Sequence, residues 1–323
     1  MNIRKLARTD LQVSPVCLGT MTFGAQTLES DAHRMVGMCL DAGVNLFDTA
    51  NVYNQGRSEE ILGKVLGSRR SQVLVASKVR GNMRGPSEYG GLSREAIHRA
   101  IHDSLQRLGT DYLDLYYLHM PDDETPAEET LETMEGLRKE GKIRHICVSN
   151  YSAWQICEMH SICERNGWQK PWISQPMYNL IARGIEQEYL PFTRRYGISN
   201  ICYNPLAGGL LTGKQSPDGG PLAGTRFDGN EVYLKRYWHP GNFESVRELG
   251  QIAKEAGLTL VQLSLAWLLN KKDVHSVLLG ASRPEQLQET LQAVEAPPLD
   301  AATLEACDRV WSALRGPAPV YNR

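Results

Sequence analysis

The sequence predicts an α/β protein in which eight parallel strands close into a (β/α)8 barrel. Eight short β-rich runs alternate with segments of helical periodicity, and this order is typical of a parallel sheet covered by helices. No linker, low-complexity stretch or shift in composition divides the 323 residues. Because eight equivalent parallel strands avoid exposed edges by closing on themselves, we expect one TIM-barrel domain over residues 1–323.

The elements can be assigned in chain order. The strands are expected at residues 15–20, 45–50, 73–79, 112–119, 143–150, 172–178, 198–205 and 274–280. Residues 1–13 alternate polar and apolar side chains, which predicts a small N-terminal β-hairpin on the barrel floor. Residues 93–109 have one apolar face and begin with a capping serine, which predicts a helix. Residues 206–272 form a long insertion between strands seven and eight, and we expect it to cover the barrel mouth.

Composition excludes several classes of function. Lys and Arg number 35 against 37 Asp and Glu, for a net charge of −2, so no basic excess is available to bind nucleic acid. No apolar run approaches the roughly 20 residues that cross a bilayer, and the polar start predicts no secretory signal; we expect no membrane partner and a cytoplasmic location. The seven scattered cysteines contain no CxxC pair, and His98 and His102 lack a third ligand, so no metal site is expected.

Ionisable groups stand at the ends of three neighbouring predicted strands. Asp48 ends the second strand, Lys78 the third and His119 the fourth, and Tyr53 follows Asp48 by five residues. In such a barrel the chemistry lies at the carboxyl ends of the strands, so the four side chains should converge. A buried charge at a strand end is costly unless it is paired, and the group therefore indicates a catalytic site.

The four groups together fit an acid that protonates a carbonyl. A tyrosine hydroxyl with a pKa near 10 is a weak acid unless a neighbouring cation favours its anion. Lys78 can supply that cation, and Asp48 can pair with the ammonium. His119 can hydrogen-bond a substrate oxygen or relay the proton.

Ordered motifs along essentially the whole chain resemble the aldo-keto reductase family. They include LFDTANVYNQGRSEEILG, VASKV, DLYYLHMPDDETPAEETL, GLRKEGKIRHICVSNYSAW, YNPLAGGLLTGK and LLGASRPEQL. Within the family, the sequence is most similar to the aflatoxin aldehyde reductase and succinic semialdehyde reductase branch. The resemblance implies an NADPH/NADP+-dependent oxidoreductase that reduces aldehydes or activated ketones to alcohols. It also implies that Asp48, Tyr53, Lys78 and His119 are the catalytic tetrad, with Tyr53 the general acid, in a monomer or homodimer that acts on a small carbonyl substrate.

The dinucleotide would need a site other than a Rossmann loop, because no GxGxxG occurs in the chain. After the eighth strand, Ser282 and Glu285 have the spacing of a capping box, which predicts a helix N-terminus suited to phosphate. Arg283 beside it could contact the 2′-phosphate. In GGLLTGK, Lys214 could neutralise the pyrophosphate, but Gln215 stands where a P-loop needs Ser or Thr, so an NTPase site is excluded.

Other strand ends offer partners for the nicotinamide. Ser149, Asn150 and Gln175 could bind the carboxamide, and Tyr203 could stack on the ring. The resemblance implies cofactor contacts from Ser149, Asn150, Gln175, Tyr203, Asn204, Pro205, Leu206, Gly208, Lys214, Gly280, Ser282, Arg283 and Gln286. Thr290 departs from the asparagine usual in the family near the adenine, so the adenine contacts are less secure than the phosphate contacts.

Substrate contacts are expected from segments that cover the mouth. Arg236 and Trp238 lie in LKRYW, and Arg323 ends the chain in PVYNR. The resemblance favours small aldehydes that bear a carboxylate, such as succinic semialdehyde, together with dicarbonyl or xenobiotic aldehydes. Arginine is the natural partner of such a carboxylate, so Arg323→Ala should raise KM selectively for carboxylate-bearing aldehydes.

Two alternatives from other classes remain. The barrel could be an NADPH-binding redox-sensor subunit that docks to a partner, or Lys78 could form a Schiff base in an aldolase. Following NADPH absorbance with a simple aldehyde, and borohydride trapping on Lys78, would separate these readings.

Overall fold

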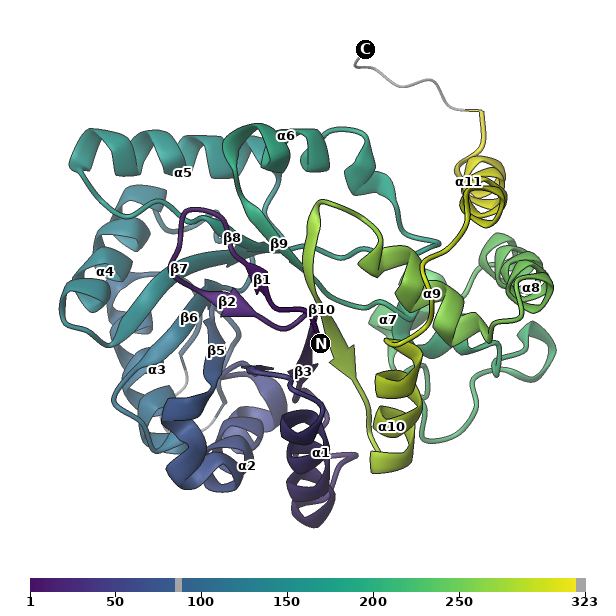
Figure 1. Ribbon diagram of the computed structural model, residues 1–323. Helices are drawn as coiled ribbons and strands as arrows, with labels where there is room; N and C mark the ends of the chain where they lie inside the picture. The colour runs from purple at the N-terminus through teal and green to yellow at the C-terminus, as the bar shows by residue number, and fades with distance from the viewer. Residues whose placement is uncertain (85–88, 318–323) are drawn as a thin grey trace.

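The computed structural model describes residues 1–84 and 89–317. In it, eight parallel strands form a closed barrel in the order β10-β3-β4-β5-β6-β7-β8-β9 (Figure 1). The strands are β3 (Val16–Gly19), β4 (Leu46–Asp48), β5 (Leu74–Val79), β6 (Leu113–Leu118), β7 (Ile143–Ser149), β8 (Ile173–Gln175), β9 (Ser199–Cys202) and β10 (Val274–Gly280). Every predicted run contains one of them, so the predicted (β/α)8 barrel is confirmed.

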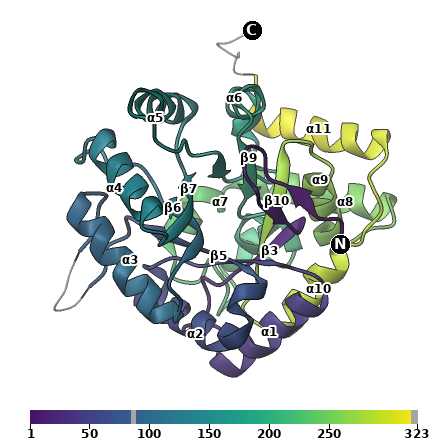
Figure 2. The same ribbon diagram turned by 60° about the vertical axis from the view of Figure 1, so that its left-hand side comes forward.

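Helices follow the strands and cover the outside of the barrel (Figure 2). They are α1 (Glu29–Asp41), α2 (Arg57–Leu66), α3 (Arg94–Leu108), α4 (Ala127–Lys139), α5 (Ala153–Asn166), α6 (Tyr189–Tyr196), α7 (Glu231–Tyr237), α8 (Pro240–Glu255), α9 (Leu260–Leu269), α10 (Pro284–Ala293) and α11 (Ala301–Arg315). The predicted helix 93–109 is α3, and the Ser93 side chain accepts a hydrogen bond from the amide of Ala96. Ser93 therefore satisfies one of the free amides of the first turn.

The N-terminal hairpin is also confirmed. Strands β1 (Arg4–Lys5) and β2 (Gln12–Val13) pair antiparallel. Leu6, Leu11 and Val13 are buried against side chains from inside the barrel, which closes the floor with apolar contacts.

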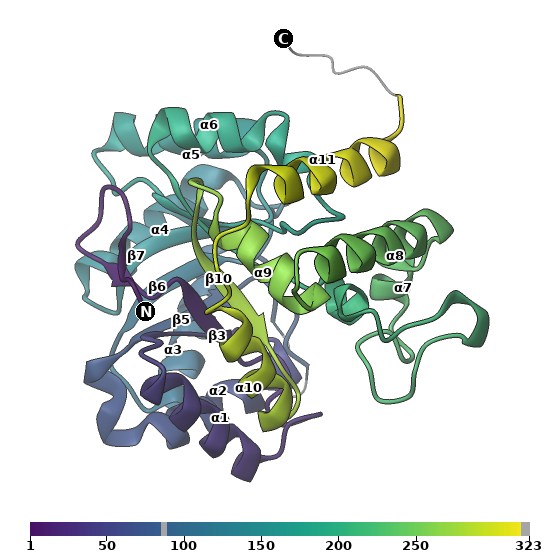
Figure 3. The same ribbon diagram turned by 45° about the vertical axis from the view of Figure 1, so that its right-hand side comes forward.

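Residues 206–272 divide into two parts. The first contains the 3₁₀ helix η4 (Ala207–Thr212), a second 3₁₀ turn η5 (Pro217–Gly219) and α7, and it contributes to the cleft at the barrel mouth. The second contains α8 and α9; α8 packs beside α11 on the outside of the molecule (Figure 3). The prediction that the insertion covers the mouth therefore describes mainly its first part, and α9 adds Val261 to the cleft lining.

Within residues 1–84 and 89–317, no single helix is long and apolar enough to cross a membrane. The pair α8 and α9, which meet at a bend of 88°, reaches the required length and composition jointly.

Candidate active site

A buried ion pair forms the base of the site. Lys78 on β5 donates to Asp48 Oδ1 at the end of β4 and to the carbonyl oxygen of Thr49 at 2.7 Å. Gln175 Nε2, at the end of β8, donates to Asp48 Oδ2 at 2.8 Å. Asp48 and Lys78 are fully buried, and these partners leave each charge compensated inside the barrel.

Tyr53 and His119 lie above this pair. Lys78 Nζ is 5.2 Å from the centre of the Tyr53 ring. The rings of Tyr53 and His119 have centroids 5.8 Å apart and meet edge to face at 80°. The barrel therefore brings together all four residues that the sequence placed at the strand ends.

Burial and nearby charges set the protonation states of Tyr53, Lys78 and His119. Burial raises the pKa of Tyr53 above 10, and the opposing effect of Lys78 is smaller. Burial lowers the pKa of Lys78, but Asp48 and Tyr53 raise it by more, so the net pKa lies above 10.5. Burial, then the charges of Lys78 and Arg80, lower the pKa of His119 to about 3. Near neutral pH the site therefore holds a phenol, an ammonium and a neutral imidazole.

A second buried carboxylate, on α2, holds β5 in position. Glu59 on α2 is fully buried, accepts from Ser77 Oγ and pairs with Arg107 Nε at 2.7 Å. Ser77 directly precedes Lys78 in β5, so this pair anchors the strand that carries the ammonium. Sequence reasoning missed Glu59 because a carboxylate in a charged helix segment carries no signal of burial.

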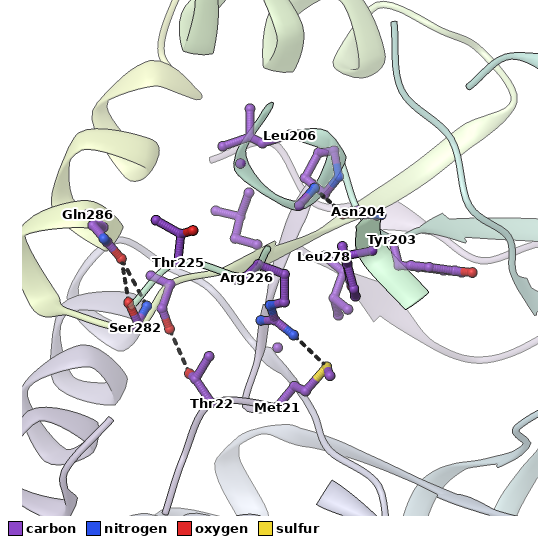
Figure 4. Close-up of a pocket in the computed structure, with 18 of the residues that line it drawn as sticks. Met21, Thr22, Tyr203, Asn204, Leu206, Thr225, Arg226, Leu278, Ser282 and Gln286 are labelled. Atoms are coloured by element: carbon purple, nitrogen blue, oxygen red, sulfur yellow. Dashed lines mark hydrogen bonds between the residues drawn. The ribbon is translucent and has the colours of Figure 1, made fainter. Parts of the chain in front are cut away.

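A cleft of about 580 Å³ opens beside the four residues and runs across the exits of β3, β9 and β10 to the start of α10 (Figure 4). Tyr53 and His119 line one end. The volume lies within the range of roughly 300–1,000 Å³ typical of ligand sites.

Most of the predicted cofactor residues line this cleft. They are Ser149, Asn150, Gln175, Tyr203, Asn204, Pro205, Leu206, Gly208, Lys214, Gly280, Ser282 and Gln286. The hydroxyl of Tyr203 donates to Asn150 Oδ1 at 2.7 Å, and Asn150 Nδ2 donates to the carbonyl oxygen of His119 at 2.9 Å. These bonds connect the predicted stacking ring to the strand end that carries His119.

The predicted capping box at the start of α10 is wrong. The helix begins at Pro284, Arg283 is its N-cap residue, and no side chain caps it. Gln286 Oε1 accepts from the amide and hydroxyl of Ser282 at 3.0 Å each (Figure 4), while Glu285 is exposed and pairs with Arg34. The proline at the first helical position moves the helix start one residue beyond the place that the S-x-x-E spacing indicated.

The far end of the cleft is charged. Lys214 lines it and lies 3.8 Å from Glu289, which lines it too. Arg283 is exposed and is absent from the cleft lining, so the structure does not bring it to the cleft. Thr290 lines the cleft but is 6% exposed, and its hydroxyl donates to the carbonyl of Gln286 within α10.

The loop after β9 fits the close approach of a phosphate. Gly208 and Gly209 have φ of 70° and 101°, a backbone that side chains rarely adopt. A Cβ on Gly209 would meet no atom within 4 Å, so there is room beside it for a ligand. The amides of Gly208 and Gly209 already donate to Asn204 Oδ1 and to the carbonyl oxygen of Leu206. Donors for a dinucleotide would come from Lys214 and from the amide end of α10, next to the space beside this loop.

The three predicted substrate residues have different outcomes. Arg236 lines the cleft. Trp238 does not line it, because its ring packs against Phe227 at 5.3 Å and Phe243 at 4.9 Å inside the insertion. Arg323 lies outside the described residues.

Several lining residues were not predicted. Met21 and Thr22 follow β3, and the rule used for the other strand ends could have found them. Arg226 and Tyr233 come from the insertion; Arg226 Nη1 contacts Met21 Sδ at 3.0 Å across the cleft (Figure 4). Tyr233 has Arg226 at 5.4 Å and Arg236 at 5.5 Å from its ring. Arg226 lies in irregular backbone, which gives no periodicity, and the seven residues of α7 are too few for a periodic pattern to indicate the direction of Tyr233.

Among residues 1–84 and 89–317, no group of three or more His, Cys, Asp or Glu side chains is placed to hold a metal ion.

Comparison with known proteins is consistent with this geometry. The model of the Aldo/keto reductase family matches residues 15–312. The chain is 36% identical to a Rattus norvegicus protein named aflatoxin B1 aldehyde reductase member 2, over 95% of this chain and 87% of that one. It is 35% identical to the human protein named aldo-keto reductase family 7 member A3, over 95% and 96%. It is also 38% identical to an Oryza sativa protein named as a probable voltage-gated potassium channel subunit beta, over 96% and 95%.

Proposed function

Because the chain belongs to the aldo/keto reductase family and is therefore an oxidoreductase, we propose that it reduces aldehydes or activated ketones to alcohols with NADPH. The observation that carries the proposal is the meeting of Tyr53, Lys78, Asp48 and His119 at one end of a cleft long enough to reach α10. The proposal treats residues 1–323 as one domain, monomeric or homodimeric, in the cytoplasm.

Tyr53 acts as the general acid. Its hydroxyl donates a proton to the carbonyl oxygen of the substrate, and its raised pKa keeps it protonated at neutral pH. As the proton leaves, the ammonium of Lys78 stabilises the developing phenolate. A positioned acid of this kind contributes about 10²–10⁴-fold to a rate.

Asp48 and His119 support this step without exchanging the proton. Asp48 holds the ammonium of Lys78 charged in a dry interior. His119 is neutral because its pKa is about 3, so it acts as a hydrogen-bond partner that orients the carbonyl oxygen, and the role of proton relay is not assigned to it.

The cofactor would lie along the cleft from Tyr203 to α10. The ring of Tyr203 would stack against the nicotinamide, and Gly208, Gly209 and Lys214 would meet the phosphates. When bound, the reduced nicotinamide supplies a hydride to the carbonyl carbon. The open space beside Gly209 and the position of Lys214 on the cleft lining support this assignment.

The substrate is proposed to be a small aldehyde that bears a carboxylate or a second carbonyl. Arg236 and Arg226 flank Tyr233 in the cleft, so two guanidinium groups are available to an anionic substrate. A relative is named for aflatoxin B1 aldehyde reduction, and a dialdehyde or dicarbonyl is therefore a second substrate class.

The test measures NADPH oxidation with succinic semialdehyde and with butanal, together with the Tyr53→Phe variant. The variant should bind NADPH as tightly as the wild type and lose at least about a hundredfold in kcat, because phenylalanine keeps the ring and removes the acid. Retained turnover in the variant, or no NADPH oxidation with any carbonyl tested, would refute the proposal.

A second candidate is a docking subunit that binds NADPH, favoured by the relatives named as potassium channel subunits. It predicts NADPH binding with turnover too slow to sustain a reductase. The aldolase alternative needs a neutral amine on Lys78, and the raised pKa of that group in contact with Asp48 disfavours it.

A further inference from the structure

The hydroxyl of Tyr237 is a buried polar group at the end of α7. The residue is 2% exposed. Its oxygen accepts from Asn204 Nδ2 at 2.8 Å and from Asn179 Nδ2 at 3.2 Å, and its hydrogen faces Met177 Sδ at 3.1 Å. All three partners follow β8 or β9, so this one oxygen ties the insertion to the barrel.

Asn204 carries the connection into the loop that faces the cofactor cleft. Its Oδ1 accepts from the amide of Gly208 at 2.7 Å, and its own carbonyl accepts from Asn179 Nδ2 at 2.9 Å. Asn204 adopts φ of 64°, a left-handed backbone that asparagine tolerates and that these bonds hold. The path from Tyr237 to Gly208 thus consists of two hydrogen bonds through one side chain.

The same helix carries the residues of the substrate side. Tyr233 and Arg236 of α7 line the cleft. The rings of Tyr233 and Tyr237 are 6.4 Å apart, and a Cβ on Gly208 would lie 2.6 Å from the ring of Tyr233. The helix therefore touches the loop twice, through the Tyr237 hydroxyl and through the Tyr233 ring.

The carbonyl of Tyr237 bonds inside the insertion, where it accepts from Asn242 Nδ2 at 2.9 Å and from the amide of His239 at 2.8 Å. Loss of the hydroxyl would thus leave the helix attached to the insertion while it loosens α7 from the loop. A buried hydrogen bond of this kind is worth about 0.5–1.5 kcal/mol, which corresponds to roughly two- to tenfold in an equilibrium constant.

We propose that the Tyr237 hydroxyl is a positioning group that couples the loop 203–208 to α7, so that a bound nicotinamide dinucleotide orders the helix that contacts the carbonyl substrate. This inference rests on the proposed function, because it assigns the loop to the cofactor and α7 to the substrate. Tyr237 itself touches neither.

The first test is the Tyr237→Phe variant, which keeps the ring and removes the oxygen. The Kd for NADPH, followed by its fluorescence, should rise about two- to tenfold, and KM for succinic semialdehyde should rise by a similar factor. Because the residues at the chemical step are unchanged, kcat should stay within about twofold. A fall in kcat with unchanged Kd and KM would overturn the proposal.

The matched control is Tyr189→Phe. Tyr189 on α6 is buried, and its hydroxyl bonds to Ser174 Oγ away from the cleft lining. This variant loses the same atom from a buried phenol, so it should lose comparable stability while it keeps Kd and KM. Equal changes in Kd and KM for both variants would attribute the effect to general loosening and would overturn the proposal.

The second test does not depend on turnover. Amide hydrogen exchange of the wild type with NADP+ alone should show protection in both 203–214 and 231–237. In Tyr237→Phe the protection should persist in 203–214 and be reduced in 231–237. Protection confined to 203–214 in the wild type would overturn the coupling.

A double-mutant cycle checks the path. Asn204→Gly removes the side chain and keeps the left-handed backbone accessible, and combining it with Tyr237→Phe should add little to the loss of NADPH affinity from either change. Additive losses would overturn the path through Asn204. A wild type that does not bind NADPH would instead refute the proposed function, so the two failures are distinct.

Discussion

The two halves of the cleft are built in different ways. One half, with Asp48 and His119 on the lining and Lys78 paired to Asp48, comes from the ends of β4, β5 and β6, where parallel pairing fixes each residue against its neighbour. The other half comes from residues 203–236, a run of 3₁₀ turns, left-handed residues and the short helix α7. The barrel thus supplies rigid chemistry on one side and an adjustable binding surface on the other.

The two halves of the cleft also differ in the free energy that their charged groups contribute. On the strand side, Lys78 and Asp48 are fully buried and compensate each other, so removal of either leaves a buried charge. On the insertion side, Arg226 and Arg236 contact a ring at the surface of the cleft, where water can replace lost partners. Substitutions on the strand side should therefore cost both stability and activity, while those on the insertion side should change affinity.

The largest expected effect comes from Lys78→Met. Loss of the ammonium leaves Asp48 buried with only Gln175 to compensate it, so the free energy of unfolding should fall by about 3–5 kcal/mol. Loss of the cation near Tyr53 should also lower kcat by at least about a hundredfold. Urea denaturation and NADPH oxidation measure the two changes.

The double variant Asp48→Asn with Lys78→Met separates the two causes. It removes both charges, so much of the stability should return while turnover stays lost. Recovery of turnover in the double variant would contradict the role of Lys78 in the chemistry, and a double variant as unstable as the single would contradict the account of its stability.

The same contrast explains what the sequence could predict. Strand-end positions follow from periodicity and topology, so Asp48, Lys78 and His119 were assigned together with Tyr53, which follows Asp48 by five residues, and the barrel brings the four together. On the insertion side, Trp238 was predicted at the substrate but packs with Phe227 and Phe243. The direction of a side chain there depends on contacts between aromatic residues far apart in the chain, which no local pattern encodes.

The start of α10 illustrates a finer limit. The S-x-x-E spacing at Ser282 is a valid capping signal, yet Pro284 sets the helix start and Gln286 takes the bonds of Ser282. Two local rules compete over three residues, and the proline decides because it disfavours helical backbone at the preceding Arg283, which is extended with φ of −140°. Ser282 and Gln286 line the cleft, although the capping box from which Ser282 was predicted does not form; their contact with a cofactor stays a prediction.

The next effect tests the glycine pair. Gly208→Ala and Gly209→Ala share the strain of a positive φ, roughly 1–2 kcal/mol, but only the Cβ at 208 meets the Tyr233 ring, at 2.6 Å. Gly208→Ala should therefore raise the Kd for NADPH by about tenfold more than Gly209→Ala, because it displaces the ring from the loop. Fluorescence titration of both variants measures the two Kd values. Equal affinities would show that the Tyr233 ring does not contribute to NADPH binding.

A smaller effect is expected for Arg236→Ala. Removal of the guanidinium should raise KM for succinic semialdehyde about fivefold relative to butanal, since an exposed charge pair contributes about 1 kcal/mol or less. Arg247→Ala on α8, an exposed arginine away from the cleft lining, serves as the control and should change neither KM. A rise of equal size for both aldehydes would show that Arg236 supports the fold of α7 and has no role in recognising the carboxylate.

The smallest expected effect concerns pH: the titration of His119 should not change the pH dependence of kcat/KM. Its pKa of about 3 keeps it neutral at all ordinary pH, and the raised pKa of Tyr53 keeps the acid protonated. The kcat/KM for aldehyde reduction should therefore be flat from about pH 5 to about pH 9, and an acid limb near the ordinary histidine pKa of about 6.5 that disappears in His119→Gln would contradict this.

The free energy of unfolding should respond to pH instead: a histidine whose pKa is lower in the folded state contributes fully above about 6.5 and loses its contribution as pH falls toward 3. His119→Gln should accordingly flatten the fall in unfolding free energy between those two values while the pH profile of kcat/KM keeps its shape.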